Sequence, residues 1–219
     1  MRLYWGAPPE DPDFHPARDG WIKLREPDPI LLQIIAIPVA GLTVVVLLAM
    51  WIALAWAHSP EGLLPSMEKP GDPGPLIVAA FSVVGVVVAI PLIVALHELL
   101  HAICFPGGLN TPHSGIGMWP SRLLFYACYL GPMSRNRFLL VYSMPLLVLT
   151  VLPLFAAALI RMTPVALAGV SILNGVFACG DLVCISILAW QVPRHATVRN
   201  QGWETWWKRP GESTIWLET

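Results

Sequence analysis

The chain has 219 residues, of which 56% are hydrophobic and 12% are charged, whereas an average globular protein is about 25% charged. The net charge is −1, and no basic cluster with interleaved aromatic residues is present, which argues against a nucleic-acid partner. The composition predicts an integral membrane protein whose surroundings are the lipid bilayer.

The first segment, residues 1–29, is polar and rich in proline, so we expect a cytoplasmic lead-in and not one regular helix. Its Trp21–Leu24 stretch suits the membrane surface. No cleavable signal peptide is expected, because the first apolar run starts near Ile30 and is too long for the apolar core of such a signal. This run should remain as a membrane anchor.

Four apolar segments reach the roughly 20 residues that a helix needs to cross a bilayer core of about 30 Å. The predicted fold is therefore all-α, with about four transmembrane helices. A proline-rich linker between the first two predicts a polar turn outside the bilayer. The segments lie at about 30–57, 76–104, 138–160 and 164–192, and the linker at 58–74.

The basic residues predict the orientation of these helices. Eleven of the 13 lie in the lead-in, the loop at 105–137 and the tail, and only Lys69 and Arg161 lie in the opposite connections. Positive charge favours the cytoplasmic side. We therefore expect both termini in the cytoplasm and a location in the cell membrane.

Two further segments have patterns other than a transmembrane helix. Apolar runs at 115–119 and 123–130 predict a β-hairpin or re-entrant segment at the membrane surface, with an amphipathic cover on the bilayer as the alternative. The tail from Pro193 alternates polar and apolar residues and carries four tryptophans, including Trp216. Strands packed under the membrane domain and an interfacial anchor both fit this tail, and we favour surface packing.

The second apolar segment ends in His97-Glu98-Leu99-Leu100-His101, an HExxH motif. On a helix the two histidines lie on one face, roughly 5–6 Å apart, so both can bind one zinc ion with Glu98 beside them as a base. Charged groups in an apolar span cost about 2.5–3.5 kcal/mol each, so the cluster requires a reason. The alternative is a polar cluster that joins helices through hydrogen bonds.

Asp181 is the predicted third ligand. A catalytic zinc ion usually takes three protein ligands, and Asp181 is the only acidic residue between Glu98 and Glu204. A metal ion supplies the charge that keeps a carboxylate ionised within the membrane. Cys104 competes for this role, because it shares the helix face of the two histidines.

Asn174 lies two helical turns before Asp181 on the same face. It could orient a substrate carbonyl or donate to the developing oxyanion, and ordinary hydrogen bonding between helices is the alternative. Gly175 and Gly180, next to these residues, predict the close approach of another helix.

HExxH in one span, with Asn174 and Gly180-Asp181 in a later one, resembles the site-2-protease-like intramembrane zinc metalloproteases, above all the small DUF3267 zincin branch. The resemblance covers roughly residues 20–210, although site-2 proteases commonly have Leu-Asp-Gly where this chain has Gly180-Asp181-Leu182. It implies peptidase activity, and loop strands that offer an edge to which an unwound substrate segment can pair.

The sequence therefore predicts a zinc-dependent peptidase that cleaves a membrane-protein or membrane-peptide substrate near the cytoplasmic face, with Glu98 moving the proton. Two alternatives stay open: an inactive metal-binding pseudoprotease or chaperone, and a proton or metal-ion transporter. The expected domains are a lead-in at 1–29, a membrane metalloprotease-like domain at 30–192, and a cytoplasmic or interfacial tail at 193–219.

Overall fold

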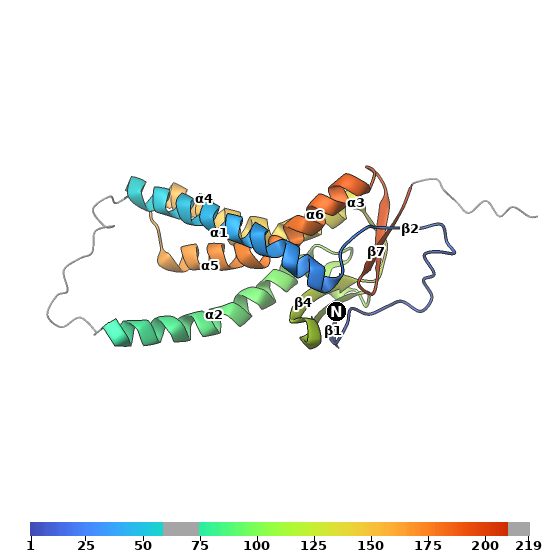
Figure 1. The fold of residues 1–219 in the computed structure, drawn as a ribbon, viewed down its shortest axis with the longest axis horizontal. Helices are drawn as coiled ribbons and strands as arrows, with labels where there is room; N and C mark the ends of the chain where they lie inside the picture. The colour runs from blue at the N-terminus through green and yellow to red at the C-terminus, as the bar shows by residue number, and fades with distance from the viewer. Residues whose placement is uncertain (59–74, 210–219) are drawn as a thin grey trace, which may run out of the picture. The chain divides into compact units, whose positions relative to one another are not determined.

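The computed structural model describes residues 1–58 and 75–209 and is mostly helical (Figure 1). Of the predicted linker at 58–74, only His58 belongs to the described residues, and Trp216 of the tail lies outside them. One long helix is interrupted by a π-helical stretch, Leu146–Val151. The α-helices are α1 (Pro29–His58), α2 (Pro75–Ile103), α3 (Arg135–Pro145), α4 (Leu152–Ile160), α5 (Val165–Phe177) and α6 (Cys179–Gln191).

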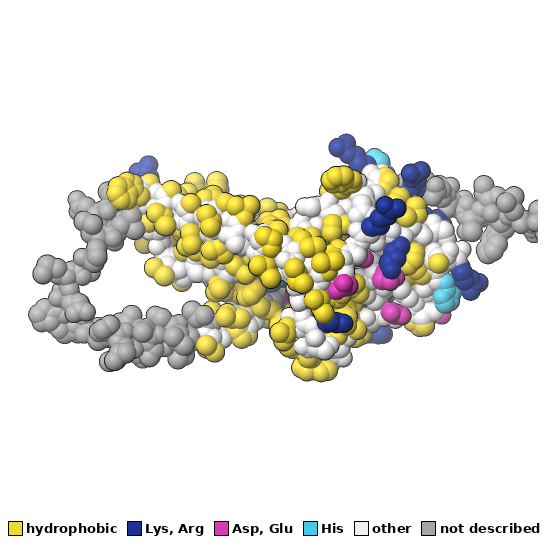
Figure 2. All heavy atoms as spheres, in the orientation of Figure 1, with side chains coloured by type: hydrophobic (Ala, Val, Ile, Leu, Met, Phe, Trp, Pro, Cys, Tyr) yellow, Lys and Arg dark blue, Asp and Glu magenta, His cyan; other side chains and the backbone are white. Residues whose placement is uncertain are grey.

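Among the described residues, two helices are long and apolar enough to cross a membrane: α1 and the run from Arg135 to Ile160. A third exists if α5 and α6 together form one broken span, and Val87–Ile103 of α2 is a shorter apolar helix. Apolar side chains of α1 are exposed, among them Ile37 and Leu42, and hydrophobic groups cover the face of α1 in Figure 2. These features support membrane association, while four spans stay a prediction.

The last apolar segment differs from the single helix predicted at 164–192. Helix α5 ends at Phe177, Ala178 has a ψ of 0°, and α6 begins at Cys179. Phe177, Cys179 and Gly180 are weak helix formers, but no proline marks the position, so the sequence does not locate the break. Its consequence is that Asp181 lies in the first turn of α6, where the helix dipole favours a carboxylate.

The predicted hairpin is present as β3 (Ser114–Trp119) and β4 (Leu124–Tyr129), which pair antiparallel. The lead-in adds a strand that was not predicted, β1 (Arg2–Trp5), parallel to β3. Glycine is required at 115, because a Cβ there would lie 2.3 Å from the Tyr4 ring. The chain is therefore not all-α.

A second sheet has the order β2-β7-β6-β5 and joins the lead-in to the tail. The tail forms a hairpin of β6 and β7, which turns at Gly202 with a φ of 59°. The sequence fitted either strands or an interfacial anchor in the tail, and the structure has strands there. The four strands are β2 (Ile22–Lys23), β5 (Met133–Ser134), β6 (Thr197–Gln201) and β7 (Glu204–Lys208).

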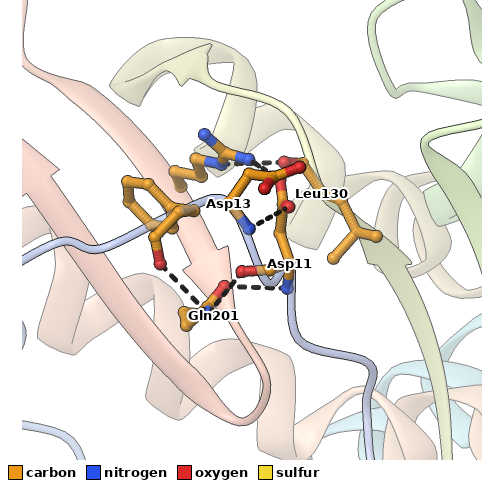
Figure 3. A network of polar contacts seen from close by, with 6 residues as sticks. Asp11, Asp13, Leu130 and Gln201 are labelled. Carbon is orange, nitrogen blue, oxygen red and sulfur yellow. Dashed lines mark hydrogen bonds and ion pairs between the residues drawn. The ribbon is translucent and has the colours of Figure 1, made fainter.

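Polar contacts fix the lead-in to β6 (Figure 3). The Arg199 guanidinium donates to the Leu130 carbonyl at 2.8 Å, forms an ion pair with Asp11, and lies 4.0 Å from the centre of the Phe14 ring. The Gln201 side chain bonds both the N–H and the C=O of Asp11. The part of the lead-in between β1 and β2, residues 6–21, is therefore held without regular secondary structure of its own.

The chain divides into two compact units. One contains both sheets, α3 and α6, and its core includes Phe105, Leu188 and Val198. The other comprises 39–97 and 146–178. In it, a Cβ on Gly175 would lie 2.5 Å from Leu47 of α1, which confirms the expected close approach. In the first unit, a Cβ on Gly180 would meet no atom of the described residues within 4 Å, so the close approach expected at Gly180 was wrong.

Glu26 is a partly buried acid beside the second sheet. Burial raises its pKa from 4.5 to about 7, although Thr205 donates to it from both its N–H and its hydroxyl. The nearby Glu204 raises this pKa further, and Lys23 lowers it. Between about pH 4.5 and 7 the folded chain therefore retains a proton that the unfolded chain has released.

We expect Glu26→Gln to remove part of the pH dependence of stability. Since the folded-state pKa is raised, the free energy of unfolding of the wild type falls as pH rises from about 4.5 to 7, by on the order of 1–3 kcal/mol. The variant should lose this decline in thermal unfolding across that pH range. The exposed Glu10→Gln is the control, and an unchanged slope in Glu26→Gln would contradict the assignment.

Candidate metal site

The HExxH motif lies in the last two turns of α2, and His97, Glu98 and His101 are all buried. Arg137 caps the end of this helix: its Nε donates to the Cys104 carbonyl at 2.8 Å and its Nη2 to the Phe105 carbonyl at 3.0 Å. A cation at a helix C-terminus is favoured by the helix dipole. The turn that carries His101 is therefore fixed from α3.

The His101 ring has a determined proton position. Its Nδ1 lies 2.8 Å from the carbonyl oxygen of Val141 in α3, and because a carbonyl can only accept, Nδ1 must carry the hydrogen. In the neutral ring Nε2 then holds the lone pair. This is the tautomer and the second contact that metal-binding histidines commonly have.

Pro145 explains why the Val141 carbonyl is accessible to His101. In an α-helix the C=O of residue 141 would accept from the N–H of residue 145, and proline has no N–H. The helix therefore lacks its own donor at that carbonyl, and His101 donates instead. The sequence analysis did not predict this contact. Its only signal was a proline inside a predicted span, which leaves the carbonyl four residues before it without a helical donor.

A second chain of hydrogen bonds determines the proton position of His97. The Thr150 hydroxyl donates to the Ser171 carbonyl at 3.1 Å, so it accepts from the Asn174 amide N–H, at 2.9 Å. The amide oxygen of Asn174 then faces His97 Nδ1, also at 2.9 Å, and accepts its hydrogen. Again Nε2 keeps the lone pair. Thr150 lies in the π-helical stretch, and the sequence did not single it out.

Asp181 completes a group of three potential ligands. One ligand atom from each of His97, His101 and Asp181 lies within 4.8 Å of the others. The histidines share one continuous helix, so their spacing is that of a helical turn, and Asp181 Oδ2 lies 3.4 Å from His101 Nε2. In tetrahedral zinc sites with bonds of about 2.0–2.2 Å, neighbouring ligand atoms are roughly 3.3–3.6 Å apart. This donor set fits zinc.

The other predicted site residues have different surroundings. Within residues 1–58 and 75–209, no metal-ligand group includes Cys104. Both ends of the Asn174 amide contact protein groups, as a hydrogen bond between helices would require; its role toward a substrate carbonyl stays a prediction. Glu98 is buried in the same part of α2 as the two histidines.

Residues 90–197 match the family DUF3267, which is described as "Putative zincin peptidase". The matched stretch runs from the motif half of α2 to the first residue of β6 and contains all three potential ligands. It supports a zincin-like family, and with it a metallopeptidase that uses zinc. No curated protein and no solved structure matches the chain.

We expect Asn174→Ala to weaken zinc binding about 10–100-fold, because His97 loses the acceptor that holds its tautomer. Asn174→Asp should retain near wild-type affinity, since a carboxylate also accepts from Nδ1–H. Competition with a fluorescent zinc chelator measures both. Equal affinity in Asn174→Ala and the wild type would show that the amide does not orient the ring.

Pro145→Ala should shift stability and zinc affinity in opposite directions. The new N–H can bond to the Val141 carbonyl and raise helix stability by up to ~3 kcal/mol, but it competes with His101 for that oxygen. We expect severalfold weaker zinc binding together with a higher unfolding temperature. Pro153→Ala, in the same helical run, is the control for stability alone. Unchanged zinc affinity in Pro145→Ala would contradict the assignment.

Proposed function

We propose that this protein is a zinc-dependent intramembrane peptidase that hydrolyses a peptide bond of a membrane-protein or membrane-peptide substrate. The observation that carries the proposal is the pair of histidine rings whose Nδ1 atoms donate to protein oxygens, with Asp181 beside Nε2 of His101. The zincin-like family and the membrane-length helices support it. A mere polar cluster between helices would not need both rings in the metal-binding tautomer.

In this proposal His97, His101 and Asp181 hold the ion. Zinc bound there supplies a Lewis acid and lowers the pKa of water toward about 7. Glu98, next to His97 in the chain, accepts the proton of the attacking water and delivers it to the leaving amine. Its burial excludes bulk water from the carboxylate.

The hairpin supports the choice of a metallopeptidase. Cys128 of β4 is buried, and this burial raises the pKa of its thiol to about 12. Since the thiolate is the nucleophile of cysteine peptidases, this thiol is inert at neutral pH. A water molecule is then the nucleophile that the residues around Glu98 can activate.

Strand β4 offers a place for an extended substrate. It forms an edge of its sheet, whose order among the described residues is β1-β3-β4. We propose that an unwound substrate segment pairs along the outer edge of β4, where backbone groups hold it regardless of its side chains. We propose also that this side of the protein and both termini face the cytoplasm, as the basic residues predict.

The test uses the purified full-length chain in detergent and a labelled membrane peptide. We expect one zinc ion per chain by elemental analysis, and less zinc in Asp181→Ala. Glu98→Gln should retain its zinc and lose peptide cleavage, because it keeps the ligands and removes the base. The exposed Glu10→Gln controls for the substitution itself.

Two results would reject parts of this proposal. Wild-type protein without stoichiometric zinc would reject the metal site. Zinc-loaded wild type that cleaves no faster than Glu98→Gln would reject the peptidase and favour a metal-binding protein without hydrolase activity.

A further inference from the structure

A cleft of about 690 Å³ lies beside the last turns of α6, opposite β2 and β7. This volume is in the range of sites that bind small molecules, about 300–1,000 Å³. The cleft belongs entirely to one compact unit. Its wall includes Ile22, Lys23, Arg25, Ile187, Trp190 and Trp207.

One wall of the cleft is held by a double hydrogen bond. The side chain of Gln191 accepts from the N–H of Arg25 at 3.0 Å and donates to its C=O at 2.9 Å, much as a neighbouring strand would. The backbone at Arg25 is therefore fixed to the end of α6. The Arg25 side chain therefore begins at a backbone position that Gln191 holds in place.

The polar part of the cleft is positive. Lys23 forms an ion pair with Glu204, whereas no acidic side chain among the described residues pairs with the Arg25 guanidinium. Nearby, Arg135 donates to the Ala189 carbonyl, one residue before Trp190. The cleft lacks an acidic wall residue, so its charge complements an anion.

The apolar part of the cleft belongs to a helix that shares a candidate membrane span. Trp190, in the last turn of α6, is 92% exposed, and Ile187 lies one turn before it. Tryptophan at the end of a membrane helix prefers the level of the lipid headgroups. An apolar wall at that level beside unpaired positive charge matches a molecule with an anionic head and acyl chains.

We propose that this cleft binds one anionic phospholipid of the surrounding bilayer, with its phosphate at Arg25 and its acyl chains along Ile187 and Trp190. The cleft takes the headgroup and the first carbons of the chains, and the rest of the lipid remains in the bilayer. The site shares no residue with the metal site, so it stands or fails independently of peptidase activity.

The experiment is native mass spectrometry of the full-length chain, released from micelles that contain equal amounts of phosphatidylglycerol and phosphatidylcholine. We expect the wild type to retain phosphatidylglycerol preferentially. Arg25→Gln should bind it about fivefold more weakly, the effect of one basic residue near an anionic lipid. Arg18→Gln removes the same charge from an exposed position of the lead-in and should change nothing.

Trp190→Ala and inorganic phosphate distinguish a lipid from a free anion. If a lipid binds, Trp190→Ala weakens retention and millimolar inorganic phosphate does not displace the lipid. Equal retention of both lipids by the wild type, equal effects of Arg25→Gln and Arg18→Gln, or full displacement by inorganic phosphate would each overturn the proposal.

Discussion

The structure depends on the requirement that polar groups buried in an apolar helical protein have partners. Leaving one such group unsatisfied costs about 1–3 kcal/mol, and more where no water can reach it. His97, Asn174, Thr150 and Ser171 meet the requirement in sequence, each donating to or accepting from the next. Because Thr150 donates to the Ser171 carbonyl and accepts from Asn174, the amide oxygen of Asn174 faces His97, and the proton on the His97 ring is placed by residues as far along the chain as Ser171.

Interruptions of regular helix supply the hydrogen-bonding groups and the helix end that the buried polar side chains contact. Pro145 removes a helical donor and leaves the Val141 carbonyl for His101. The π-helical stretch that follows contains Thr150. The break at Ala178 begins a new helix two residues before Asp181, and its dipole favours the carboxylate. In a membrane such irregular backbone is tolerated where protein buries it or where it lines a cavity, which is the situation of a functional site.

Part of this arrangement could be predicted from the sequence. HExxH implied two histidines on one helical face, and Asp181 was the only acid available to join them. The hairpin was visible because its runs flank a turn with proline. The strands of the lead-in were not, because β1 and β2 are two to four residues long and find partners more than 100 residues away. Such pairing leaves no local pattern to detect.

The role of Asn174 shows why the remaining details were beyond sequence reasoning. Position and chemistry alone allowed an amide that donates to a substrate carbonyl. The choice depends on which way the amide faces, and that is decided by Thr150, which itself donates to Ser171. A hydroxyl residue in an apolar span is commonplace, so the sequence gives no reason to single out Thr150. The contacts of Thr150 and Ser171 turn the amide oxygen of Asn174 toward His97, so the metal site depends on the packed helices as much as on the motif, while a role of Asn174 toward a substrate carbonyl stays a prediction.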